Sequence, residues 1–381
     1  MVDRNRKIMR YRRFGKTQLN LSVFSLGTMR CLSSLSQLEE TVHQALDLGI
    51  NNIETARGYG KSEIYLGQVL AKIPREKFYI TTKICPADNA EAMERAIEES
   101  LQRLQLDYVD NLAIHGINTS EHFEQVTRSS GCFSAIEKAQ VAGKIKHIGF
   151  STHGSLDLIL NLLKTDLFSF INLHYYYFWQ RNAPAIALAA EKDLGIFIIS
   201  PSDKGGQLYT PPERLTHLCH PFTPLAMNYR FLLSDRRITT LSLGPAHPQE
   251  LIEPLQVADQ DWPLTAQEQA IFDRLEDTQT ETLGSDRCRQ CYQCLPCPEN
   301  IAIPDILRLR NLAIAYDMEK FGQYRYQMLE NAGHWFPGRR GEHCTDCGDC
   351  LPRCPEKLDI PTLLRDSHQR LQGSPRRRLW G

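Results

Sequence analysis

Residues 133–151 read FSAIEKAQVAGKIKHIGFS and contain the repeating unit from which the fold is built. The amphipathic stretch Phe133–Ala142 predicts a helix, and Gly143 predicts its end. The apolar and β-branched run Ile145–Ser151 then predicts a buried strand. A chain in which such helices and strands alternate folds around a parallel sheet.

The same alternation extends along the N-terminal part of the chain. Eight candidate strands are Val23–Gly27, Asn52–Thr55, Phe78–Lys83, Val109–His115, Ile145–Ser151, Phe170–His174, Ile196–Ser200 and Thr239–Gly244. Candidate helices besides Phe133–Ala142 are Ser36–Leu48, Asn89–Leu104, Ser155–Lys164, Pro184–Leu194 and Leu225–Leu233. Eight strands with intervening helices predict a closed (β/α)8 TIM barrel, for which ~250 residues is the usual size.

Eight of the twelve cysteines lie near the C-terminus in two runs. The first run is Cys288, Cys291, Cys294 and Cys297, and the second is Cys344, Cys347, Cys350 and Cys354. A proline follows the last cysteine of each run. This pattern resembles the iron–sulfur ligand motif of bacterial ferredoxins and predicts two 4Fe–4S clusters.

The resemblance to two-cluster ferredoxins implies that each run lends its last cysteine to the other cluster. Cys354 would then complete the cluster of the first run, and Cys297 the cluster of the second. The first run departs from the pattern, because only two residues precede Cys297. Structural zinc usually takes separated cysteine pairs and fits these consecutive runs poorly. Disulfides are disfavoured because a cytosolic location is expected.

The cysteine runs set the predicted domain organisation. Residues 1–280 form the barrel, with Tyr11–Leu21 as a small hairpin across its bottom. Residues 281–381 form a small, mostly α-helical ferredoxin-like iron–sulfur domain. Further predicted helices are Pro248–Leu255, Leu264–Asp277, Pro304–Asp317 and Glu319–Gly333. Apart from the cysteine runs, the sequence shows no internal repeat.

The net charge and the apolar runs of the sequence indicate which partners and which cellular location to expect. The 381 residues carry a formal net charge of −1, which gives no electrostatic case for nucleic acid. No apolar run approaches the ~20 residues that span a bilayer. The N-terminus, MVDRNRKIMRYRR, lacks an apolar signal segment, so we expect a cytoplasmic protein.

Titratable side chains stand at three successive strand ends, where barrel enzymes carry their chemistry. Glu54 and Tyr59 follow the second strand, Lys83 ends the third and His115 ends the fourth. Singly, each side chain has an ordinary structural explanation. Together, and with residues 49–60, Thr82-Lys83 and Asp107–Asp110, they resemble the aldo-keto reductases, in particular the branch with a ferredoxin-like extension.

The resemblance implies a catalytic tetrad in which Tyr59 is the general acid that protonates a carbonyl oxygen. A phenol with a reference pKa of ~10 needs a nearby cation to act well at neutral pH, and Lys83 would supply that charge. Glu54 would orient Lys83, and His115 would help to place the substrate oxygen. The family usually has aspartate at the position of Glu54.

The resemblance also implies a nicotinamide dinucleotide, with NADP(H) as the family expectation. The residues that would hold it are Ser151, Thr152, Asn172, Ser200, Ser202, Lys204, Gly205 and Gly244. The loop Ser200–Gly206 would wrap the pyrophosphate, although a plain exposed turn explains Ser202–Gly206 equally well when it is read alone. Ile199 stands where an aromatic ring often stacks on the nicotinamide. We find no clear cation for a 2′-phosphate beyond Arg236 and Arg237, which precede the eighth strand.

Two functions of different classes follow from these features. The first is an NAD(P)H-dependent oxidoreductase that reduces a small carbonyl or quinone-like substrate, with clusters that exchange electrons with the barrel site or with a partner such as a ferredoxin. The second is an electron-transfer or redox-sensing protein on a catalytically altered barrel. A third option makes the clusters structural. The aromatic segment His174–Trp179 would line the substrate pocket or pack against helices.

Overall fold

A computed structural model describes residues 9–129, 131–260 and 262–375. It contains two compact units, one of residues 1–205 with 228–263 and the other of residues 206–227 with 264–381. The division near residue 280 stays a prediction. The expected location rests partly on residues 1–8, which lie outside the described residues.

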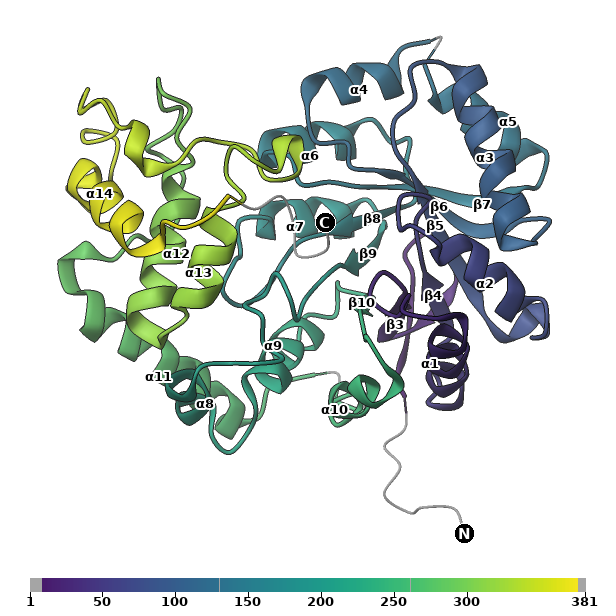
Figure 1. Cartoon of the computed structure of the whole chain (residues 1–381), viewed down its shortest axis with the longest axis horizontal. Helices are drawn as coiled ribbons and strands as arrows, with labels where there is room; N and C mark the ends of the chain where they lie inside the picture. Colours follow the sequence, from purple (N-terminus) through teal and green to yellow (C-terminus); the bar gives the residue numbers. More distant parts are fainter. Residues whose placement is uncertain (1–8, 130, 261, 376–381) are drawn as a thin grey trace. The chain divides into compact units, whose positions relative to one another are not determined.

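The first unit holds a closed barrel of eight parallel strands (Figure 1). Neighbouring strands follow the order β10-β3-β4-β5-β6-β7-β8-β9 around the barrel. The strands are β3 (Phe24–Gly27), β4 (Asn52–Glu54), β5 (Tyr79–Ile84), β6 (Val109–His115), β7 (Ile145–Ser151), β8 (Phe170–Leu173), β9 (Gly195–Ile198) and β10 (Thr240–Leu243). The predicted barrel is therefore confirmed.

Helices connect the strands in chain order. They are α1 (Leu35–Asp47), α2 (Ser62–Leu70), α3 (Ala90–Leu104), α4 (Ser120–Thr127), α5 (Phe133–Val141), α6 (Leu156–Lys164), α7 (Ala183–Glu191), α8 (Glu213–Cys219) and α9 (Pro224–Leu233), with α10 (Ile252–Leu255) after β10. The sequence analysis missed α2, α4 and α8. In α4 only Val126 is buried, so no apolar stripe marks this helix.

An N-terminal hairpin covers one end of the barrel. Its strands β1 (Tyr11–Arg13) and β2 (Asn20–Ser22) pair antiparallel. Phe14 at the turn packs against Phe170 with a ring-centroid distance of 5.3 Å. A Cβ at Gly195, the first residue of β9, would overlap the Phe14 ring. The hairpin therefore lies at the N-terminal ends of the strands, as predicted.

A belt of hydrogen-bonded polar side chains crosses five neighbouring strands inside the barrel. Its members, all buried, are Thr240, Ser25, Asn52, Thr81 and Asn111. Each is bonded to the next, at distances from 2.8 to 3.2 Å. Because side chains alternate along a strand, the residues two positions further on share this inner face. Glu54 and Lys83 are therefore the next inward positions after the belt on β4 and β5.

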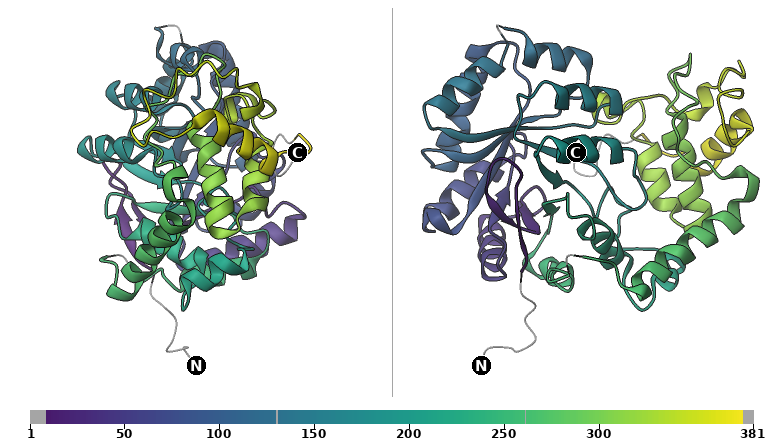
Figure 2. Two further views of the ribbon diagram at one scale, coloured as in Figure 1. Left: turned by 90° about the vertical axis from the view of Figure 1, so that its left-hand side faces the viewer. Right: turned by 180° about the vertical axis from the view of Figure 1, so that it is seen from behind.

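The second unit is mainly helical. Besides α8 it contains α11 (Ala266–Leu283), α12 (Ile303–Tyr316), α13 (Glu319–Tyr326) and α14 (Ile360–Leu371). Figures 1 and 2 show α12, α13 and α14 side by side. Arg310 on α12 pairs with Asp366 on α14 at 2.6 Å, and the Tyr316 hydroxyl donates to the Leu275 carbonyl of α11 at 2.7 Å.

One helix prediction in this unit is wrong in part, and one helix was not predicted. α13 ends at Tyr326, and not at Gly333, because the chain then turns and Glu330 has a φ of 69°. The Asn331 amide caps this turn by donating to the carbonyls of Gln327 and Leu329 at 3.0 Å each. α14 was not predicted, although the Asp359 side chain caps it by accepting from the Thr362 amide. Within the described ranges, we find no helix with the length and apolarity to cross a membrane.

Candidate active site and iron–sulfur centres

Three of the predicted catalytic residues meet inside the barrel, around the ammonium of Lys83. Lys83 on β5 forms a buried ion pair with Glu54 at the end of β4. Its Nζ also donates to the Thr55 carbonyl at 3.0 Å and to the Tyr59 hydroxyl oxygen at 3.3 Å. An ammonium has three N–H groups, so these three acceptors fix its orientation. Since Tyr59 accepts from Lys83, its own proton is left for a substrate oxygen.

The fourth residue, His115, lies on the other side of Tyr59. The two rings are edge to face, with centroids 5.7 Å apart. His115 is the last residue of β6, and Tyr59 lies in the loop after β4. The structure therefore brings all four predicted residues together at the carboxyl ends of neighbouring strands, where a barrel positions its chemistry.

Burial and neighbouring groups shift the proton affinities at this site. Burial lowers the pKa of Lys83 well below its usual value, and the charge of Lys204 lowers it further. The Glu54 carboxylate acts in the opposite direction, because it favours the charged ammonium. Burial also raises the pKa of Tyr59, with a smaller contribution from Cys85. Tyr59 therefore keeps its proton at neutral pH and is poised as an acid.

Ser151, Thr152 and Asn172, three of the residues predicted to hold the dinucleotide, differ in whether protein groups already occupy their hydrogen-bonding atoms. The Ser151 hydroxyl accepts from the Gly116 amide at 3.0 Å, and the Thr152 hydroxyl donates to the Ile117 carbonyl at 2.7 Å. Both side chains therefore hold the loop after β6. Asn172 on β8 is fully buried, and neither atom of its amide has a hydrogen-bond partner. Such an orphaned amide fits a ligand that both donates and accepts hydrogen bonds.

The loop after β9 carries the residues predicted for the pyrophosphate. Ser200 begins it with a φ of 53°, and its carbonyl accepts from the Lys204 amide at 3.1 Å. Ser202 and Gly205 are buried. A Cβ at Gly205 would overlap the Pro201 carbonyl, so the loop is wound too tightly there for any side chain.

The side chain of Lys204 lies beside a buried histidine. Its Nζ is 3.5 Å from His174 Nε2, and His153 Nε2 is 3.3 Å from the same atom. The Tyr176 hydroxyl donates to the Ile199 carbonyl at 2.6 Å, so its oxygen accepts from His174 Nδ1. His174 Nε2 is therefore an acceptor in the neutral tautomer. Sequence reasoning missed this arrangement, because its members come from three different loops.

The predicted aromatic pocket wall is largely packed inside the barrel unit. Tyr175, Tyr176, Phe178 and Trp179 are all buried. The Tyr177 ring packs edge to face on Phe231, with centroids 5.5 Å apart. The packing alternative for this segment therefore describes most of its residues.

Gly244 follows β10, and its carbonyl accepts from Arg30 at 2.7 Å. Arg30 also pairs with Glu250 at 3.0 Å. The part of the predicted cofactor site around Gly244 therefore contains a cation that sequence reasoning missed, because Arg30 belongs to the loop after β3. Arg237, in contrast, pairs with Asp235 at 2.6 Å ahead of β10.

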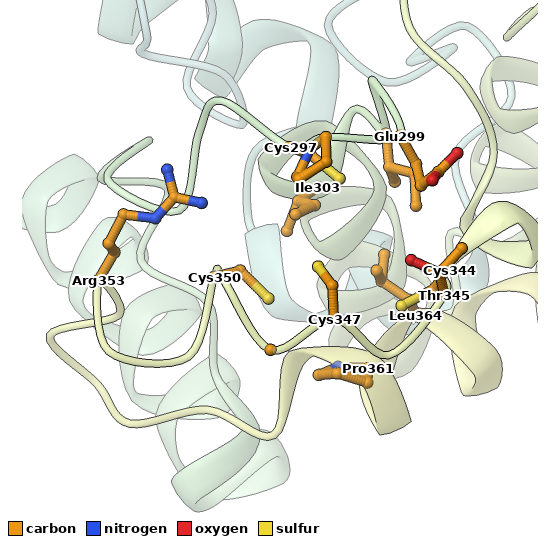
Figure 3. A pocket seen from close by; sticks show the side chains of 13 residues that line it. Cys297, Glu299, Ile303, Cys344, Thr345, Cys347, Cys350, Arg353, Pro361 and Leu364 are labelled. Carbon is orange, nitrogen blue, oxygen red and sulfur yellow. The ribbon is translucent and has the colours of Figure 1, made fainter.

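The eight clustered cysteines of the second unit line two separate cavities. One is lined by Cys297, Cys344, Cys347 and Cys350, and Figure 3 shows these side chains directed toward one space. The other is lined by Cys288, Cys291, Cys294 and Cys354. Each cavity thus combines three cysteines of one run with the last cysteine of the other, which is the sharing that the ferredoxin resemblance implies.

Two matching helix starts close these cavities. Cys297–Leu307 and Cys354–Leu364 share Cys-Pro-Glu, Ile-Pro and a final Leu at identical spacing. In both, the third residue after the cysteine donates its amide to the cysteine carbonyl, at 2.9 Å in one and 3.1 Å in the other. Pro304 and Leu307 line the cavity of Cys288, and Pro361 and Leu364 line that of Cys344. The repeat thus extends beyond the cysteine runs.

The cavities fit a group that stabilises thiolates. Burial raises the pKa of Cys288 to about 11 and that of Cys294 to about 12. A bound metal would supply the positive charge that such thiols need to ionise at neutral pH. All twelve cysteines are free of disulfides. Isoleucine, leucine and proline side chains complete each wall, and the N-termini of α12 and α14 favour negative charge there.

Comparison with known families agrees with both parts of this description. The model of the aldo/keto reductase family matches residues 24–277, and the model of the 4Fe-4S dicluster domain matches residues 287–359. The chain belongs to the aldo/keto reductase family, and it carries a C-terminal 4Fe–4S dicluster domain. Like named members of that family, it is an oxidoreductase.

Several curated proteins resemble the barrel. An L-galactose dehydrogenase of Arabidopsis thaliana is 31% identical over 233 residues, which cover 56% of this chain and 70% of that protein. A 6-dehydroglucose reductase of Novosphingobium aromaticivorans is 31% identical over 160 residues, which cover 37% of this chain and 51% of that protein. The chain spans about half the length of several curated relatives that it matches.

Solved structures share the fold. An aldo-keto reductase of Bacillus halodurans in its holo form matches with a TM-score of 0.62 at 21% identity, covering 70% of this chain and 96% of that one. An aldo-keto reductase of Klebsiella pneumoniae in complex with NADPH matches with a TM-score of 0.58 at 20% identity, covering 70% and 95%. At these identities the likeness shows the fold alone.

Proposed function

We propose that the barrel reduces the carbonyl group of a small molecule with NADPH, and that the chain holds two 4Fe–4S clusters that exchange electrons with the barrel site or with a partner protein. The observation that carries the proposal is the arrangement around Lys83, which orients the Tyr59 hydroxyl and leaves its proton available. A reduced nicotinamide supplies hydride when bound, and the clusters supply single electrons.

Side chains of the barrel donate the proton, stabilise the developing charge and orient the substrate. Tyr59 donates its proton to the substrate oxygen as negative charge develops there, and the Lys83 ammonium stabilises the resulting phenolate. Glu54 keeps Lys83 charged and oriented, and His115 donates a second hydrogen bond to the substrate oxygen. The substrate is thus an aldehyde, ketone or quinone-like compound small enough to bring its oxygen to Tyr59.

The cofactor site fits a nicotinamide dinucleotide at two places. The orphaned Asn172 amide offers a donor and an acceptor for the carboxamide. At the other end, Arg30 beside Gly244 offers a cation for a 2′-phosphate, and Lys204 lies on the loop proposed for the pyrophosphate. The Klebsiella pneumoniae protein of the same fold binds NADPH, which supports the choice of NADP(H). A reducing compartment such as the cytoplasm suits twelve free thiols.

The cysteine cavities favour two clusters, and a one-electron partner such as a ferredoxin suits them. Cys291 and Cys347 are exposed, one from each cavity, so each proposed cluster has a ligand at the surface of the second unit. Surface ligands leave a short path for an electron to a docked carrier protein.

A second candidate is an electron-transfer or redox-sensing protein whose barrel no longer turns over a substrate. Ile199 favours it, because this side chain packs against the apolar cluster of Phe14 and Phe197 and presents no aromatic ring for a nicotinamide.

The Tyr59→Phe variant separates the two candidates. We expect it to lower kcat for NADPH-dependent carbonyl reduction by roughly 10²- to 10⁴-fold, the usual contribution of a general acid, with iron and sulfide content unchanged. Tyr65→Phe, which removes a hydroxyl on α2, is the matched control and should keep the activity. Wild-type holoprotein that neither binds nor oxidises NADPH with any of a panel of aldehydes, ketones and quinones would favour the second candidate.

A further inference from the structure

Glu54 is held by a second group besides Lys83, on the opposite side of its carboxylate. The Ser242 hydroxyl on β10 donates to Glu54 Oε2 at 3.1 Å, while Glu54 Oε1 faces the Lys83 ammonium. All three side chains are buried. Each carboxylate oxygen therefore has its own partner, and the two partners come from strands on either side of β4.

The Ser242 contact reaches across the strand between β10 and β4. That strand is β3, whose last residue, Gly27, is directly opposite Glu54 in the parallel register. A Cβ on Gly27 would lie 2.6 Å from the Ser242 hydroxyl oxygen and 3.2 Å from Glu54 Oε2. Any side chain at position 27 would therefore occupy the space through which this hydrogen bond passes.

From this geometry we propose that Ser242 is a positioning residue for the proposed reductase reaction. Gly27 leaves the space, and Ser242 supplies the hydrogen bond, that together allow a glutamate at position 54 to hold Lys83. A glutamate side chain is one methylene longer than an aspartate. The extra length carries the carboxylate over Gly27 to Ser242, which anchors it while its other oxygen pairs with Lys83. The inference rests on the proposed function, because it explains how Lys83 is held beside Tyr59.

Several charged or titratable groups lie beside the Lys83 ammonium or beside the Tyr59 side chain that it contacts, and Ser242 acts directly on only one of them, Glu54. These groups are Glu54 on β4, Tyr59 after β4, Cys85 after β5, His115 on β6 and Lys204 after β9. A hydroxyl that donates to a carboxylate favours its charged form, and the carboxylate in turn favours the charged lysine. Without the Ser242 hydroxyl the Glu54 carboxylate is no longer held against the ammonium, so the charged lysine loses stabilisation and the pKa of Lys83 falls further.

The test is the Ser242→Ala variant, read in two ways. In holoprotein labelled with [¹³Cε]lysine, with Lys83→Met to assign the signal, we expect the Lys83 titration to move to lower pH. The alkaline limb of kcat/KM for NADPH-dependent carbonyl reduction should move in the same direction, and kcat/KM should fall about tenfold, as expected for a hydrogen bond to a charged group. Gly27→Ala should act in the same direction.

Two comparisons make the test specific. Ser25→Ala removes a buried hydroxyl from β3 that bonds to Thr240 and Asn52 and not to Glu54, so it should leave the Lys83 titration unchanged. In a Glu54→Asp background the carboxylate no longer reaches Ser242, so Ser242→Ala should change kcat/KM less than about threefold.

The proposal is overturned if the pKa of Lys83 is the same in the Ser242→Ala variant as in the Ser25→Ala variant. It is also overturned if Ser242→Ala has the same effect with Glu54 and with Asp at position 54. A wild-type protein without NADPH-dependent turnover would contradict the proposed function, and the Lys83 titration would still decide whether Ser242 holds the Glu54–Lys83 pair.

Discussion

Lys83 is the residue on which the proposed barrel chemistry depends. Its charged form is opposed by burial and by Lys204, and it is favoured by Glu54. A lysine held between such opposing effects loses its proton at lower pH than an exposed lysine does. Turnover that needs the charged lysine is therefore full at low pH, and it is lost as the pH rises through the lowered pKa of Lys83.

This balance predicts the effect of removing the like charge. The variant Lys204→Met should raise the pKa of Lys83, so the alkaline limb of the kcat pH profile should move to higher pH. KM for NADPH should also rise severalfold if Lys204 contacts the pyrophosphate. The measurement is initial rate against pH at saturating NADPH, with Lys192→Met, a lysine paired with Asp166 on the surface, as the control. A limb that does not move, or moves to lower pH, would contradict this account of Lys83.

At this scale the sequence predicted the residues that have a local signal. Lys83 and His115 lie at the ends of strands whose pattern is clear and Tyr59 follows another, so their meeting point could be placed from topology alone. Ser242 could not be predicted, because it meets Glu54 from 188 positions away and serine is common in strands. Gly27 looked like an ordinary strand end, and only the register with Glu54 gives it a role.

At the scale of elements, the first residues of α12 and α14 connect the two cysteine cavities structurally. α12 and α14 each begin with Ile-Pro, and the two residues of each pair line different cavities. The Asn311 amide on α12 donates to the Cys288 carbonyl at 2.9 Å, and Arg353 donates to the Pro296 carbonyl at 2.9 Å, which ties the second cysteine loop to the first. The two cavities therefore form together.

Shared ligation predicts which pairs of cysteine substitutions are equivalent. Cys297→Ser with Cys347→Ser changes two ligands of one cavity, so about four irons per chain should remain. Cys294→Ser with Cys297→Ser changes one ligand in each cavity, although both residues belong to the same run. This second pair should lower the iron content much further and disturb both clusters.

Iron and sulfide analysis of the anaerobically purified variants is the measurement, and the wild type should hold about eight irons. If the pair Cys294 and Cys297 keeps about four irons while the pair Cys297 and Cys347 loses nearly all, each run holds its own cluster and the sharing is wrong.

Sequence patterns predicted those helices and strands that have a clear run or face of apolar residues. Elements without such a pattern were missed or given wrong ends. Most residues of the barrel strands are buried, and apolar residues recur in every strand, so all eight strands could be predicted. α2 buries Ser62, Glu63 and Gly67 along with its apolar residues, so its periodicity is weak. The predicted helix Glu319–Gly333 is longer than α13, because polar and aromatic residues continue past Tyr326, where the backbone turns.

At the scale of the whole molecule, one chain carries two kinds of redox module. Hydride transfer moves two electrons together, whereas a 4Fe–4S cluster passes one at a time. The family match covers the barrel and the dicluster match covers the cysteine region, so both sets of residues belong to recognised redox modules. Sequence alone could identify the modules, because their ligands are closely spaced or stand at strand ends.

The central claim is that a nicotinamide site in the barrel and the two clusters work as one redox system. The measurement that tests it most directly is the visible absorbance of anaerobic holoprotein before and after addition of NADPH, with the iron content of the same sample. We predict about eight irons per chain and bleaching of the cluster band by NADPH, which should be lost in a Cys294→Ser, Cys297→Ser variant. Eight irons without any bleaching, in protein that oxidises NADPH when a carbonyl substrate is added, would contradict the claim.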